Sequence, residues 1–162
     1  MRNLLISVMA ILLFILDQTF VPFLSINGSY GSLLFAFFGI FALLSDYEDA
    51  FLLAIVVGFL QDIFFPYAFG LNILTNLVLF FGLSKAGETL KEGRKTIPVL
   101  FVTLAQGLKN LLIVGVFSLF GYHSNFTSVL LAPIFTFIFA IFLYNRVIAF
   151  RRIPMIKKEW KF

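Results

Sequence analysis

Residues 58–77 read GFLQDIFFPYAFGLNILTNL, two apolar segments on either side of a turn that contains Pro66 and Tyr67. Proline punctuates helices, so the stretch predicts that one helix ends before the turn and another begins after it. Asp62 lies in the first segment beside a glutamine, and two asparagines lie in the second. An ionisable side chain at membrane depth is costly and needs a partner. The stretch therefore predicts two membrane helices whose polar faces turn away from lipid.

The whole chain is as apolar as this stretch. Of its 162 residues, 61% are hydrophobic and 12% are charged, whereas a soluble domain carries about 25% charged residues. A chain of this length has room for about six spans of roughly 20 residues each. The sequence therefore predicts an all-α integral membrane protein, a compact bundle of six transmembrane helices that forms a single domain over residues 1–162.

The apolar runs place the six predicted spans, which lie at about 3–24, 30–44, 50–65, 70–84, 97–120 and 126–148. The second and fourth are short for a bilayer core of about 30 Å, so we expect local thinning or burial among neighbouring helices. With the N-terminus in the cytoplasm, every lysine and arginine in a loop or tail falls on the cytoplasmic side. This pattern predicts a multi-pass membrane protein with both termini in the cytoplasm.

Asp62 and Lys109 share a predicted depth. Each lies about 12 residues from the cytoplasmic start of its span, or roughly 18 Å along the helix. Because a pair of opposite charges is less costly in a membrane than either charge alone, we expect Asp62 and Lys109 to form an ion pair. Such a pair could equally fix the arrangement of the helices or form part of a binding site.

Other polar residues recur at helical spacing on the same predicted faces. We expect them to complete one intramembrane polar cluster near the outer end of the bundle, where they could bind a ligand. The cluster comprises Asp17, Gln18, Gln61, Asp62, Asn72, Asn76, Gln106, Lys109 and Asn110.

The C-terminal tail, residues 149–162, mixes basic and aromatic side chains directly after the last span. Basic residues at this position attract anionic lipids at about 1 kcal/mol each. The tail is therefore a predicted contact for lipids or for a cytoplasmic partner, through Arg151, Arg152, Lys157, Lys158 and Trp160. A simple anchor that fixes topology would have the same composition.

Signatures of catalysis do not occur in the sequence. It has no GxSxG, HExxH or glycine-rich phosphate loop, the patterns that supply a nucleophile, a metal site or a phosphate cradle. The single histidine, His123, has no second histidine to help it hold a metal, and there is no cysteine. We therefore expect a protein that is not an enzyme and that needs neither a cofactor nor a metal.

The central stretch, with Gly58, Gln61, Asp62, Gly70 and Asn72, resembles the MreD family of bacterial rod shape-determining membrane proteins, as do the length and six-span layout. The resemblance implies a non-enzymatic scaffold of the cell-elongation machinery, located in the bacterial inner membrane. It also implies partners: an MreC-like bitopic membrane protein and, through it, the actin-like MreB and the RodA and PBP2 peptidoglycan synthases.

The same family is similar in fold to the S-components of energy-coupling-factor transporters, and this likeness implies a second function, a subunit that binds a vitamin or another small solute. S-components usually carry a ladder of alanines on the first helix for docking. The first predicted span here offers only Ala10, which favours the scaffold.

Overall fold

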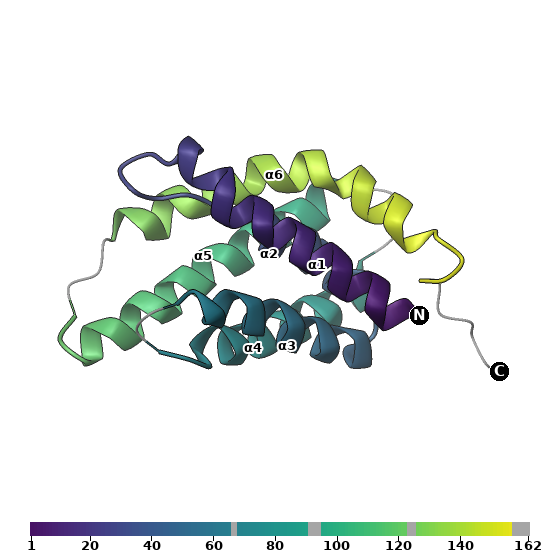
Figure 1. The fold of residues 1–162 in the computed structure, drawn as a ribbon, viewed down its shortest axis with the longest axis horizontal. Coiled ribbons are helices and arrows are strands. Elements are labelled where there is room, and N and C mark those ends of the chain that lie inside the picture. Colours follow the sequence, from purple (N-terminus) through teal and green to yellow (C-terminus); the bar gives the residue numbers. More distant parts are fainter. Residues whose placement is uncertain (66–67, 91–94, 123–125, 157–162) are drawn as a thin grey trace.

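The computed structural model describes residues 1–65, 68–90, 95–122 and 126–156. This part of the chain is all-helical, with six α-helices, one short 3-10 helix and no β-strand. The elements are α1 (Arg2–Thr19), η1 (Val21–Leu24), α2 (Leu33–Leu43), α3 (Tyr47–Ile63), α4 (Leu71–Thr89), α5 (Thr96–Leu119) and α6 (Thr127–Arg151). Successive α-helices run back and forth along the long axis, which brings the start of α1 and the end of α6 to the same end of the bundle (Figure 1).

Three of these helices are both long enough and apolar enough to cross a membrane. They are α1, α5 and the segment Val129–Arg151 of α6. A hydrocarbon core about 30 Å thick requires about 20 apolar residues in helical form, and α2, with 11 residues, falls well short of that length.

The short helix α2 is the centre of the bundle. It packs against each of the other five α-helices, and every residue from Leu34 to Leu43 is buried. A helix that is apolar on all sides is typical of a position enclosed by protein rather than one with a solvated face. Burial among neighbours, one of the two outcomes expected for the short second span, is therefore how α2 is accommodated.

The fourth helix is longer than predicted. It continues to Thr89 through Ser84, Lys85 and Gly87 instead of ending near residue 84. The hydroxyl of Ser84 donates a hydrogen bond of 2.7 Å to the carbonyl oxygen of Ser45, and Gly87 lies against the end of α2. These contacts with the turn between α2 and α3 hold the polar segment in helical form, which its composition alone did not indicate.

Two glycines allow the helices to approach closely. A Cβ atom on Gly58 would lie 2.5 Å from the Cα of Ile73, and one on Gly87 would lie 1.7 Å from the carbonyl oxygen of Leu43. Real Cβ atoms do not come this close to other atoms. The contact of α3 with α4 therefore requires glycine at position 58, and the contact of α4 with the end of α2 requires glycine at position 87. Gly58 thereby sets the separation between α3 and α4 next to Asp62.

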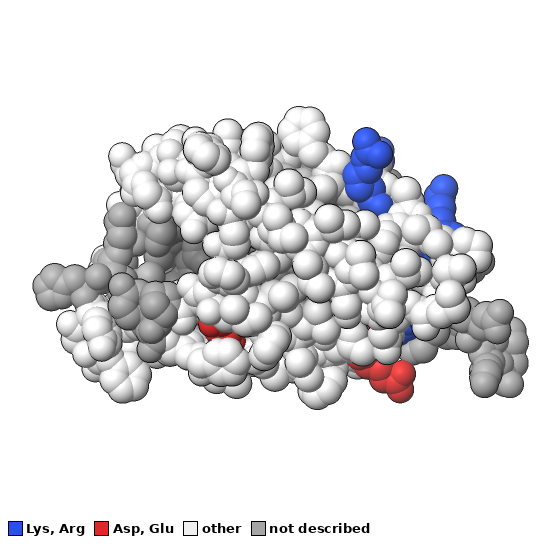
Figure 2. Space-filling view, in the orientation of Figure 1, with Lys and Arg blue, Asp and Glu red and all other residues white. Residues whose placement is uncertain are grey.

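Charged side chains gather at the end of the bundle that holds the start of α1 and the end of α6. Figure 2 shows the visible lysine and arginine side chains toward that end of a surface that is otherwise largely uncharged. Arg2 at the start of α1 forms an ion pair with Asp49 at the start of α3, and Arg151 donates a hydrogen bond to the carbonyl oxygen of Leu44 after α2. The opposite end contains the polar cluster.

Candidate functional site

Asp62 lies in the last turn of α3 and binds the first turn of α4. Its carboxylate accepts hydrogen bonds from the backbone N–H of Asn72 at 3.0 Å and of Ile73 at 3.1 Å. The side-chain amide of Asn72 donates a third bond of 3.0 Å. The first N–H groups of a helix have no partner within that helix, and the helix dipole favours an anion at this position. Asp62 therefore caps α4 and is only 1% exposed.

Asp17 has the same role one hairpin earlier. It lies in the last turn of α1 and accepts hydrogen bonds from the backbone N–H of Leu33 at 2.6 Å and of Leu34 at 3.1 Å. The hydroxyl of Ser32 donates to the same carboxylate at 2.6 Å and itself accepts a bond from the N–H of Phe35. Each carboxylate thus accepts hydrogen bonds from the first N–H groups of the helix that follows its own.

The direct ion pair predicted between Asp62 and Lys109 is wrong. Among the described residues, no carboxylate oxygen lies within 4.0 Å of the Lys109 amine. The amine instead donates hydrogen bonds of 2.5 Å to Oε1 of Gln61 and 2.8 Å to Oδ1 of Asn76. The physical reason is that the lone pairs of Asp62 are directed at the backbone of α4, where unpaired N–H groups would otherwise remain buried.

The hydrogen-bond partners of the buried lysine are therefore neutral side chains. The amide of Asn76 also donates a 3.0 Å bond to Oε1 of Gln61, so one oxygen joins α3, α4 and α5. The ring of Phe35 on α2 lies 5.1 Å from the Lys109 nitrogen, within the range of a cation–π contact. Lys109 is only 3% exposed, so this lysine faces the interior of the bundle.

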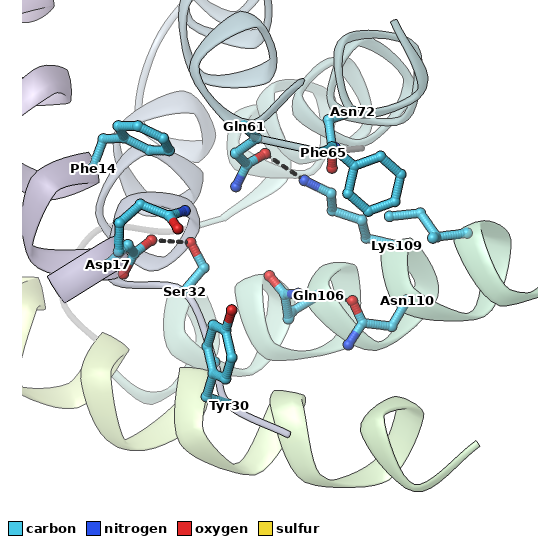
Figure 3. Close-up of a pocket in the computed structure, with 13 residues that line it drawn as sticks. Phe14, Asp17, Tyr30, Ser32, Gln61, Phe65, Asn72, Gln106, Lys109 and Asn110 are labelled. Carbon is cyan, nitrogen blue, oxygen red and sulfur yellow. Dashed lines mark hydrogen bonds between the residues drawn. The ribbon is translucent and has the colours of Figure 1, made fainter. Parts of the chain in front are cut away.

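A cavity of about 170 Å³ opens beside these residues. Figure 3 shows it between Asp17 and Ser32 on one side and Lys109 with Gln61 on the other, with Gln106 and Asn110 below. Its polar lining residues are Asp17, Gln18, Tyr30, Ser32, Gln61, Asn72, Gln106, Lys109 and Asn110.

Seven of the nine predicted cluster residues line this cavity: all except Asp62 and Asn76. Asp62 lies in the last turn of α3 and binds the start of α4, and Asn76, which is buried, joins the group through its hydrogen bonds with Lys109 and Gln61.

 Gln18 is exposed at the edge, whereas Gln106 is buried and donates a 3.1 Å bond to Asn110.

Two polar lining residues were missed by the sequence analysis, Tyr30 and Ser32. Ser32 could have been found, because a serine directly before an apolar run is a common N-cap. Tyr30 carried no such signal, since it lies in a connection whose path cannot be inferred from periodicity.

The predicted tail contact is described only in part. Arg152 is exposed, and Arg151 lies with its guanidinium 5.9 Å from the ring of Phe41 and donates to the carbonyl oxygen of Leu44. Arg151 thus has an intramolecular role that its sequence position did not indicate. Lys157, Lys158 and Trp160 lie outside the described residues, as does His123.

Within the residues that the structure describes, no group of three or more histidine, cysteine or acidic side chains could hold a metal ion. Comparison with known proteins adds no assignment: no protein-family model, curated protein or solved structure matches the chain. The site is therefore defined by its geometry alone, a polar cavity with a buried lysine and two helix-capping aspartates.

Proposed function

We propose that this chain is a non-enzymatic membrane scaffold of the bacterial cell-elongation machinery, similar to MreD. In this proposal all six helices cross the inner membrane, with both termini in the cytoplasm. Support comes from the lysine and arginine side chains visible in Figure 2, which gather at the end that holds the start of α1 and the end of α6, as cytoplasmic positive charge does in membrane proteins.

The observation that carries the proposal is the structural role of the residues in the stretch that resembles MreD. Gly58 permits close contact with Ile73, and Asp62 caps α4 through Asn72. Gly70 precedes α4 with a φ of +97°, a left-handed conformation that glycine adopts without steric cost. Each of these residues helps to fix the position of α4 relative to α3. The motif therefore has a structural role in a rigid hairpin, and a scaffold requires a rigid shape.

The outer faces of the bundle suit a partner helix. Apolar side chains point outward along α1, α5 and α6, and the most exposed within the helices include Leu4, Leu104, Leu119, Leu130 and Phe142. Lipid and a neighbouring transmembrane helix both accept such surfaces. The partner proposed for this surface is the single helix of an MreC-like bitopic protein, which would link the scaffold indirectly to MreB and to the RodA and PBP2 synthases.

Depletion of the protein in a rod-shaped bacterium that encodes it tests this function. We expect depleted cells to become round, and expression of the wild-type chain to restore rods together with co-purification of a bitopic protein. The exposed-lysine variant Lys85→Gln is the matched control and should restore rods equally well, because Lys85 lies outside the polar cluster. Depleted cells that remain normal rods would contradict the proposal.

The cavity favours a second candidate, a solute-binding subunit similar to an S-component. A polar space of about 170 Å³ with a buried lysine is what a solute site requires. Against it, Ala10, the only alanine of α1, is fully buried and is not available for docking. Co-purification of an ATPase pair, together with a vitamin requirement in the depleted strain, would favour this candidate over the scaffold.

A further inference from the structure

The cavity carries opposite charges on facing walls. Asp17 from α1 and Lys109 from α5 both line it, and Figure 3 shows them on opposite sides of the space. The two are more than 4.0 Å apart, since no ion pair joins them among the described residues. Each is at least nine-tenths buried, with exposed fractions of 6% and 3%. The space between them is therefore strongly polarised.

Both charged groups have unused hydrogen-bonding capacity. The Lys109 amine donates to Gln61 and Asn76, which leaves one of its three N–H groups without a described acceptor. Oδ1 of Asp17 accepts one bond, from the backbone N–H of Leu33, although a carboxylate oxygen can accept two. A cavity occupant can therefore receive a hydrogen bond from Lys109 and donate one to Asp17.

A third group in the cavity, the side-chain oxygen of Gln106, lacks a hydrogen-bond donor. Oε1 of Gln106 is buried and has no hydrogen-bond partner in the part of the chain that the structure describes. Gln106 is 6% exposed and lines the cavity. Leaving a buried acceptor unsatisfied is costly, so the occupant should carry N–H or O–H groups on the side that faces Asp17 and Gln106.

We propose that this cavity binds a small zwitterion of the α-amino acid class, with its carboxylate on Lys109 and its ammonium between Asp17 and Gln106. A simple anion would meet the charge of Asp17, and a simple cation would meet that of Lys109, so a solute with only one charge fits one wall and is repelled by the other. The volume of about 170 Å³ corresponds to about six water molecules at about 30 Å³ each, which suits the smallest amino acids.

This binding does not depend on the cell-shape function. A scaffold can hold a small solute as well as a transport subunit can, and the test uses purified protein and no cell-shape phenotype. Failure of the binding test would leave the shape proposal standing, and a normal rod after depletion would leave the binding proposal standing.

The first experiment is titration calorimetry of the full-length protein in detergent micelles. The probes are glycine, L-alanine and L-serine, with acetate and methylammonium as controls that each carry one of the two charges. We expect at least one of the three zwitterions to bind saturably, and at least about tenfold more tightly than either control, as the loss of one charge-assisted hydrogen bond implies.

Variants of two cavity residues on α5 identify the contacts. Lys109→Gln should weaken binding of the zwitterion at least about tenfold, and Gln106→Met should also weaken it because the ammonium loses an acceptor. Lys85→Gln, at the other end of the molecule, is the matched control and should bind as the wild type does. Circular dichroism and size-exclusion chromatography establish that each variant is folded.

Several outcomes would overturn the proposal. One is the absence of saturable binding for all three amino acids with folded wild-type protein. A second is equal affinity for acetate or methylammonium, which would mean that only one wall is used. A third is unchanged affinity in a folded Gln106→Met variant, and this result would remain informative even if Lys109→Gln did not fold.

Discussion

Asp17 and Asp62 each lie in the last turn of one helix and accept hydrogen bonds from the first turn of the next. In both hairpins the carboxylate comes from the preceding helix, so it fixes the position of one helix relative to the other as well as capping it. In a membrane, an unpaired backbone N–H cannot turn to water. The capping role therefore explains why a chain this apolar contains two aspartates near one end of the bundle.

Removing the charge of Asp62 should destabilise the protein. Asp62→Asn keeps one oxygen acceptor but turns an NH₂ group toward the N–H groups of α4, and it removes the attraction to the helix dipole. We expect a loss of about 1–3 kcal/mol in the free energy of unfolding, measured by denaturant titration in detergent. Glu88→Gln, an exposed acid on the same α4, should change it by less than about 0.5 kcal/mol. Equal effects from the two changes would refute the capping role.

An exchange of charge between Asp62 and Lys109 separates capping from ion pairing. If the two residues formed a direct pair, the double variant Asp62→Lys with Lys109→Asp would recover the stability lost in each single variant. The structure predicts no recovery, because a lysine at position 62 cannot accept the N–H bonds of Asn72 and Ile73. Thermal unfolding of the two single variants and the double variant decides the question. A double variant more stable than either single one would restore the ion-pair hypothesis.

At this scale the sequence predicted which residues gather but not which atoms meet. Helical spacing correctly placed Gln106 and Lys109 on one buried face, and Asn72 and Asn76 on another. Spacing along a helix says nothing about which neighbouring helix supplies the partner, so Lys109 was paired with Asp62 instead of with Gln61 and Asn76. The carboxylate of Asp62 instead accepts hydrogen bonds from the backbone of α4.

Helix lengths show how tertiary contacts modify what hydropathy predicts. Apolar runs located all six helices, because side chains that face lipid or a dry core share the same composition. They did not show that α2 is enclosed on all sides, since burial in protein and exposure to lipid select similar residues. They also ended α4 too early, because the polar residues near its end are held by the turn between α2 and α3.

The contact between α3 and α4 depends on Gly58. Gly58→Ala places a methyl group 2.5 Å from the Cα of Ile73, so the helices must separate and we expect a loss of about 1–3 kcal/mol in the free energy of unfolding. Gly115→Ala is the matched control in α5, where a Cβ would meet nothing within 4 Å. There the higher helix propensity of alanine should leave stability unchanged or raise it by up to about 1 kcal/mol. Similar losses at both positions would contradict this account of the packing.

For the whole molecule, charge and shape define two different ends. One end holds the start of α1, the end of α6 and the lysine and arginine side chains visible in Figure 2, and the other holds the cavity and the two capped helix starts. Loop charge was readable from the sequence, because the positive-inside rule depends on residue type and order alone. The volume of the cavity could not be predicted from the sequence. It depends on the distance between α1 and α5, which no local sequence pattern specifies.

The central claim is that the chain crosses the membrane six times and presents the cavity end to the outside. The chain has no cysteine, so single cysteines can be introduced at exposed positions at each end and treated with a membrane-impermeant maleimide in intact spheroplasts. The account predicts that cysteines at the cavity end react in intact spheroplasts, and that those at the charged end react only after permeabilisation. The positions are Asn27, Phe69 and Tyr122 at the cavity end, and Glu48, Lys95 and Arg152 at the charged end. Reaction from the same side at Asn27 and Lys95, or at Phe69 and Glu48, would contradict it.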